Sequence, residues 1–74
     1  MKGDIKKKIG NRIRLMREKK GMTQEQLALK VGYDSRTTIC CIETGSRGVP
    51  IDKIIEIAKC LDCTPDYLTF GKEE

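Results

Sequence analysis

Apolar residues recur along this chain at the spacing of α-helices, and no stretch alternates as a strand would. The first series predicts a helix over 5–20. Its apolar positions are Ile5, Ile9, Ile13 and Met16. Basic residues occupy most of its other positions, and Gly21 can adopt the left-handed conformation that ends a helix. An amphipathic helix with a basic surface is therefore expected at the start of the chain.

The next apolar series predicts a helix over 24–31 with a well-defined start. Thr23 and Gln26 have the spacing of a capping box, so the helix begins at Gln24. Its buried stripe is formed by Leu27, Ala28 and Val31. Leu29 falls outside that stripe and is expected to be exposed, either as an ordinary surface residue or as part of a partner surface, and Gly32 closes the helix.

A short third helix is predicted over about 35–44, capped by either Asp34 or Ser35. Ile39 and Ile42 are its only strongly apolar residues, and they are three positions apart. A helix with so narrow an apolar stripe touches the core along one line and leaves the rest of its surface free for another contact. Residues 23–45 are thus expected to form two short helices joined by a tight turn.

The remainder of the chain predicts two more helices after a loop over 45–50. A helix over 51–61 is the most apolar of all and is expected to be the central packing element. Its apolar residues are Ile51, Ile54, Ile55, Ile57, Ala58 and Leu61. Thr64 and Pro65 have the composition of a helix start, and a short last helix follows over 65–70. These patterns predict an all-α fold, a compact five-helix bundle made by one domain over 1–74, with flexible ends at 1–4 and 71–74.

Length and composition limit the function. A chain of 74 residues without histidine has little room for an enclosed catalytic cavity and pairs no nucleophile with a base, so an enzyme is not expected. A membrane-spanning helix needs an apolar run of about 18 residues, which the chain lacks, and its first residues do not form a signal peptide. We therefore expect a cytoplasmic protein that does not contact a membrane and uses no cofactor.

The net charge of +4 is distributed unevenly. Residues 1–20 contain nine Lys or Arg against two acidic residues, whereas residues 48–74 contain three against six. Such an asymmetry favours a protein that presents one face to a polyanion such as nucleic acid. A basic first helix that is simply solvated is the alternative interpretation.

Several short motifs follow one another in the chain. They are Ile9-Gly10-x-Arg12-Ile13-x-x-x-Arg17, Gly21-Met22-Thr23-Gln24-Glu25-x-Leu27-Ala28-x-x-Val31-Gly32, Ile39-x-x-Ile42-Glu43-x-Gly45 and Ile57-Ala58-Lys59-x-Leu61, followed by Asp66-x-Leu68. With these motifs the chain resembles, from Ile9 to Gly71, the phage lambda-repressor/Cro-like (XRE) family of helix-turn-helix regulators. The resemblance implies a lambda-repressor-like bundle that binds double-stranded DNA and regulates transcription as a repressor. Between Gly32 and Ile39 the chain is one residue longer than the family's commonest form, so a longer turn is expected.

The resemblance places the helix over about 35–44 in the major groove, where base-pair edges can be distinguished. The base contacts that it implies are Arg36, Thr37, Cys40 and Cys41. Arg36 can donate two hydrogen bonds to guanine, and Thr37 can offer a hydroxyl to a base edge and a methyl group to thymine. A phosphate contact or a solvated side chain is the alternative role for Arg36.

The resemblance also implies phosphate contacts on both sides of the groove. They are Thr23, Gln24, Thr44 and Arg47. The first two lie at a helix start, where unpaired amides and the helix dipole favour an anion, and the other two are otherwise a solvated helix end and loop. In similar proteins an arginine of the first helix pairs with a glutamate that ends the third. A partly buried ion pair between Arg17 and Glu43 is therefore implied.

Four cysteines raise two further hypotheses. Cys60 and Cys63 have the CxxC spacing of a zinc knuckle, but an adjacent pair such as Cys40 and Cys41 is not a usual source of further ligands. No metal site is therefore expected, and the first pair is expected to serve as small apolar residues without a disulfide. The adjacent pair is expected to be exposed, where oxidation or modification would abolish DNA binding; base contact or simple tolerance is the alternative.

One short helix contacts only a few base pairs, so a homodimer on a pseudo-palindromic operator is expected. Leu68, Phe70 and the loop near Val49 are the candidates for the dimer contact. The competing class is an antitoxin-like or adaptor module whose bundle mainly binds a protein partner. Salt-sensitive binding to duplex DNA with a sequence preference would distinguish the regulator from the adaptor.

Overall fold

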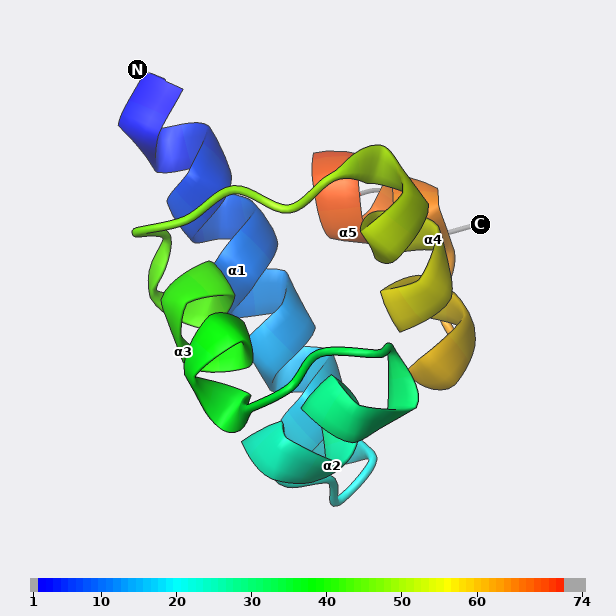
Figure 1. The fold of residues 1–74 in the computed structure, drawn as a ribbon. Coiled ribbons are helices and arrows are strands. Elements are labelled where there is room, and N and C mark those ends of the chain that lie inside the picture. The colour runs from blue at the N-terminus through cyan, green and yellow to red at the C-terminus, as the bar shows by residue number, and fades with distance from the viewer. Residues whose placement is uncertain (1, 72–74) are drawn as a thin grey trace.

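The structure, a computed structural model, describes residues 2–71 and is all-helical over that range. Its helices are α1 (Lys2–Lys19), α2 (Gln24–Lys30), α3 (Arg36–Thr44), α4 (Ile51–Cys60) and α5 (Pro65–Phe70), arranged as a compact bundle (Figure 1). The predicted all-α, five-helix fold is confirmed over these residues. Residues 2–4, which we expected to be flexible, belong to α1, and the rest of the predicted flexible ends, apart from Gly71, lies outside the described residues. No helix within residues 2–71 has both the length and the apolarity that a membrane crossing requires.

The helices begin and end where short-range interactions provide caps. Thr23 and Gln26 form the predicted capping box, in which the Thr23 hydroxyl oxygen accepts from the Gln26 amide at 3.0 Å and Gln26 Oε1 accepts from the Thr23 amide at 2.8 Å. The Thr64 hydroxyl oxygen accepts from the Tyr67 amide at 3.0 Å, as expected for a cap. At the other end of α5, Arg12 Nη1 donates to the Leu68 carbonyl oxygen at 3.2 Å, which satisfies an acceptor that the helix leaves open.

The centre of the bundle is the contact between α1 and α3. Gly10 is buried there, and a Cβ at this position would lie 2.1 Å from the Ile42 carbonyl oxygen and 2.8 Å from that of Glu43. Only glycine therefore allows the two helix backbones to approach so closely. Helix α3 also packs on α2, and α5 packs on both α1 and α4.

The core contains one contiguous apolar cluster. Its buried members are Ile13, Leu27, Ala28, Val31, Ile39, Ile42, Ile54, Ile57, Ala58, Leu61 and Leu68. The predicted stripes of α2 and α3 are confirmed, and Leu29 is exposed as expected. Leu68, in contrast, is fully buried, so its predicted place in a dimer contact is wrong. Its side chain is needed to join α5 to the core.

Helix α4 is not the central packing element that its composition indicates. It packs on α2 and α5 at the edge of the bundle, and Ile51 and Ile55 are exposed. These two residues extend the apolar arc of α4 beyond the surface that its neighbours cover. Ile5 is exposed for a similar reason, because the first turns of α1 project past the helices packed against it (Figure 1).

Candidate nucleic-acid interface

Helices α2 and α3 pack on each other and are joined by the turn over 31–35. Gly32 has a left-handed φ of 86°, and the Tyr33 amide donates to the Ala28 carbonyl oxygen at 2.9 Å, which reverses the chain. Ser35, one of the two expected caps, is the residue that precedes α3, although its side chain makes no capping hydrogen bond. The longer turn thus ends α2 with backbone contacts and leaves the start of α3 without a side-chain cap.

The accessible side of α3 carries the four residues predicted to contact bases. Arg36 and Thr37 are exposed, whereas Cys40 and Cys41 are half-buried and so less exposed than expected. Positions 36, 37, 40 and 41 lie within less than half of the helix circumference, so they share one face. Arg36 is the only exposed charged residue of α3, because Glu43, the other charged residue of the helix, is buried.

Arg17 and Glu43 form an ion pair beneath α3. Arg17 Nε donates to Glu43 Oε2 at 2.7 Å, and Arg17 Nη2 donates to Glu43 Oε1 at 3.1 Å. A third donor, Arg17 Nη1, binds the Met22 carbonyl oxygen at 2.7 Å. The two residues are only 8% and 7% exposed, and the hydrogen bond to Glu43 raises the pKa of Arg17 above its ordinary value despite burial. The pair therefore joins α1, the segment before α2, and the end of α3.

Gln24 connects this ion pair to the surface. Its Nε2 donates to Glu43 Oε1 at 3.1 Å, and its Oε1 accepts from Arg36 Nη1 at 3.4 Å. Because a carboxylate only accepts hydrogen bonds, the amide nitrogen of Gln24 must face Glu43 and its oxygen must face the guanidinium. A continuous chain of hydrogen bonds thus leads from the buried Arg17 to the exposed Arg36.

The start of α2 borders a shallow, open depression. The residues around it are Arg17, Met22, Thr23, Gln24, Glu25 and Arg36. The side chain of Gln24, predicted to contact a phosphate, is engaged within the protein in this structure, and the Thr23 hydroxyl oxygen caps the helix. The unpaired amides of the first turn and the positive end of the helix dipole remain available for an anion at this place.

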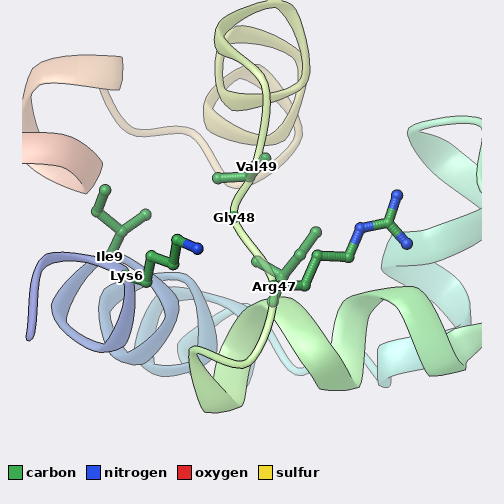
Figure 2. Close-up of a pocket in the computed structure, with 6 residues that line it drawn as sticks. Lys6, Ile9, Arg47, Gly48 and Val49 are labelled. Atoms are coloured by element: carbon green, nitrogen blue, oxygen red, sulfur yellow. The ribbon is translucent and has the colours of Figure 1, made fainter. Parts of the chain in front are cut away.

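The end of α3 holds the other two predicted phosphate contacts. The Thr44 hydroxyl donates to the Cys41 carbonyl oxygen at 3.1 Å, and the Arg47 amide reaches the same oxygen at 3.3 Å. The Arg47 side chain is exposed and extends away from the loop (Figure 2). It has no carboxylate partner among the side chains of residues 5–71. Arg47 is therefore the better placed of the two for a phosphate.

Lys6 and Lys7 of α1 also lie near this end of α3, although we did not single them out from the sequence. A Cβ on Gly45 would lie 2.6 Å from Lys7 Cγ, and one on Gly48 would lie 3.5 Å from Lys6 Cε. The basic run at the start of the chain and the glycine at position 10 were the available signals, because that glycine brings α1 against α3.

The cysteines of the CxxC pair are half-buried at the end of α4 and beyond it. Burial, with the negative charge of the adjacent Asp62, raises the pKa of the Cys63 thiol. Within the described part of the chain, no three His, Cys, Asp or Glu side chains lie close enough together to hold a metal ion. The packing of Cys60 and Cys63 against the core agrees with their expected role as small apolar residues.

Known proteins are similar to this chain in fold and in sequence. The Helix-turn-helix family profile matches residues 13–68. Control protein C.BamHI of Bacillus amyloliquefaciens is 37% identical to this chain. The alignment, 79 positions long with gaps, covers 100% of this chain and 96% of that protein. The crystal structure of the restriction-modification controller protein C.AhdI from Aeromonas hydrophila superposes with a TM-score of 0.81 at 35% identity, covering 89% of this chain and 94% of that one. The P22 c2 repressor protein, solved in complex with a synthetic operator, has a TM-score of 0.80 at 33% identity over 86% of this chain and 96% of its own. The chain therefore belongs to the helix-turn-helix family, among the lambda-repressor/Cro-like regulators.

Proposed function

We propose that this protein is a sequence-specific, DNA-binding transcriptional regulator that acts as a repressor and places α3 in the major groove. The observation that carries the proposal is the exposed Arg36 at the start of α3. Its guanidinium donates a hydrogen bond to Gln24, and Gln24 in turn donates to Glu43 of the Arg17–Glu43 pair. The similarity of the chain to a repressor solved with operator DNA, to a restriction-modification controller protein and to a control protein supports the same role. Such a protein acts by binding, catalyses no reaction and works in the cytoplasm.

The contacts divide into two kinds. Arg36 and Thr37 recognise base edges, with the thiols of Cys40 and Cys41 as softer, less polar neighbours. The first turn of α2, with Thr23 and Gln24, holds a phosphate on one side of the groove. Arg47, with Thr44 beside it, holds one on the other. Base contacts supply sequence preference, whereas phosphate contacts fix the register of the protein on the duplex.

Binding to DNA selected from a random pool tests this assignment. Arg36→Ala is expected to lose about 1–3 kcal/mol of discrimination at one base pair while its nonspecific affinity falls less. Lys59→Ala is the matched control, since it removes a positive charge from an exposed position on α4. No preference for any duplex in the parent protein would contradict the proposal and favour the adaptor class. If Arg36→Ala and Lys59→Ala lost the same amount of base-pair discrimination, the proposed role of Arg36 would be wrong.

We further propose that the protein binds a pseudo-palindromic operator as a homodimer. Phe70 of α5 is 71% exposed and Ile51 of α4 is 66% exposed, and these two helices pack on each other. Figure 1 shows the start of α4 and the end of α5 at the same end of the molecule. Exposed apolar side chains mark protein contacts where they form one contiguous patch, and we propose that these two belong to one patch. Half-sites about 34–36 Å apart are then expected, because two copies of α3 must meet successive turns of the groove.

Sedimentation equilibrium of Phe70→Ser tests the dimer. The variant is expected to be more monomeric than the parent at equal concentration, whereas Leu29→Ser, at an exposed apolar position on α2, is expected to dimerise normally. A monomeric parent at concentrations that saturate the DNA would contradict the proposal.

A further inference from the structure

A small groove opens between α1 and the loop over 45–50, at the end of α3. Its volume is about 220 Å³, and its walls are formed by Lys6, Ile9, Ile42, Arg47, Gly48 and Val49. Figure 2 shows Ile9 and Lys6 on α1 facing the loop that carries Gly48 and Val49. The proposed base and phosphate contacts do not use its apolar walls, which are formed by Ile9, Ile42 and Val49.

The groove combines apolar walls with positive charge at its mouth. Ile9, Ile42 and Val49 supply the walls, and the ammonium of Lys6 lies beside them, whereas the guanidinium of Arg47 extends away on the other side of the loop (Figure 2). Neither cation has a carboxylate partner among the side chains of residues 5–71. The backbone amides of Gly48 and Val49 likewise donate to no acceptor within the described residues. Such a site favours a ligand that is apolar at one end and anionic at the other.

The size of the groove narrows the class of ligand. An apolar cavity of about 150 Å³ is enough to admit benzene, whereas drug-sized ligands need about 300 Å³ or more. The groove, at about 220 Å³, therefore fits one aromatic ring with a short acidic arm. A DNA phosphate could contact Lys6, but it would leave the apolar walls in contact with water.

We propose that this groove binds a small aromatic carboxylate, with the ring between Ile9 and Val49 and the carboxylate at Lys6 and the adjoining loop. The bound anion adds a negative charge at the end of α3, next to the loop from which Arg47 is proposed to reach a phosphate, so it lowers the affinity for DNA. This consequence rests on the proposed function, whereas binding of the carboxylate does not.

Titration of the isotopically labelled protein with phenylacetate tests the site without DNA. Saturable chemical-shift changes are expected at the Gly48 and Val49 amides and at the Ile9 and Ile42 methyl groups. Phenylacetamide, which lacks the charge, and acetate, which lacks the ring, are expected to bind more weakly. An acetate titration that reproduces the phenylacetate shifts, or no saturable shift at millimolar phenylacetate, would overturn the proposal.

Two variants locate the ligand. Gly48→Leu places a side chain in the groove; its Cβ would make an ordinary contact of 3.5 Å with Lys6 Cε, so the loop need not move, and phenylacetate binding should be lost. Lys6→Gln is expected to weaken binding about two- to fivefold, as for an exposed ion pair. Lys8→Gln, which removes an exposed charge nearby on α1, should leave it unchanged. If Gly48→Leu bound phenylacetate as the parent does, or if Lys6→Gln and Lys8→Gln weakened phenylacetate binding equally, the proposed position of the ligand would be wrong.

A DNA titration then separates this inference from the proposed function. Phenylacetate is expected to lower the affinity of the parent for its duplex and to have no effect on Gly48→Leu. If phenylacetate binds in the groove but DNA affinity does not change, the competition with Arg47 is wrong. If no duplex binds at all, the proposed function fails while the groove assignment stands on the phenylacetate shifts.

Discussion

Replacing Glu43 with alanine would leave a positive charge without its partner inside the protein. The Arg17 guanidinium would lose two hydrogen bonds, at 2.7 and 3.1 Å, and Gln24 would lose the acceptor for its amide nitrogen. Arg17 would keep the Met22 carbonyl oxygen at 2.7 Å and the exposed Glu18 carboxylate at 3.9 Å. Because Arg17 is only 8% exposed, water cannot fully replace what is removed.

The expected loss of stability follows from this geometry. Removing one partner of a buried ion pair destabilises a protein by about 3–5 kcal/mol. The two remaining contacts of Arg17 favour the lower end, about 3 kcal/mol. For a domain of this size each kcal/mol lowers Tm by about 4–8 °C, so a decrease of about 12–24 °C is expected. Against a total stability of about 4–11 kcal/mol, this loss is large.

Urea unfolding followed by circular dichroism measures this loss. Glu18→Ala is the matched control, because it removes the exposed carboxylate that lies 3.9 Å from the same guanidinium and should change stability by less than about 0.5 kcal/mol. The double variant Arg17→Met with Glu43→Leu removes both charges and should recover most of the stability. A Glu43→Ala protein as stable as the parent would refute the reasoning.

Three further outcomes are expected. Gly10→Ala should destabilise the protein by about 3 kcal/mol in urea unfolding, because the new Cβ would lie 2.1 Å from the Ile42 carbonyl oxygen; unchanged stability would contradict the close approach of α1 and α3. Arg47→Ala should weaken binding to all duplexes alike and reduce the slope of log affinity against log salt by about one; an altered base preference would contradict a phosphate contact. The hydrogen bond from Lys20 lowers the pKa of Asp62. Asp62 therefore stabilises the fold at pH values above its ordinary pKa of 3.8, and this stabilisation is lost as the pH falls through the lowered pKa. Asp62→Asn should remove this part of the acid dependence of Tm.

Features set by neighbouring residues were predictable from the sequence. The capping box at Thr23, the cap at Thr64 and the stripe of α2 depend on residues three or four positions apart, and the structure contains all of them. The short apolar stripe of α3 likewise indicated a helix with a free outer face. Each of these signals is local, so the pattern alone was enough.

Features set by packing between helices were not predictable in this way. The composition of α4 indicates a central helix, but composition does not say how many neighbours a helix has, and Ile51 is exposed while Leu68 is buried. The position of Lys6 beside the groove depends on the approach of α1 to α3 at Gly10. That approach is a property of two segments more than thirty residues apart.

The contacts of Arg36, which is proposed to recognise a base, also depend on packing between helices and could not be predicted from the sequence pattern. A free arginine side chain samples many rotamers, and ordering it on binding costs up to about 2 kcal/mol. The hydrogen bond to Gln24 restricts the guanidinium before DNA arrives, and Glu43 in turn fixes the amide of Gln24. At 3.4 Å between exposed groups, the bond to Arg36 is weak enough to be exchanged for a base edge. The position of the proposed base-contacting side chain is therefore linked to a buried ion pair, because Glu43, which Arg17 holds, accepts the hydrogen bond that orients Gln24.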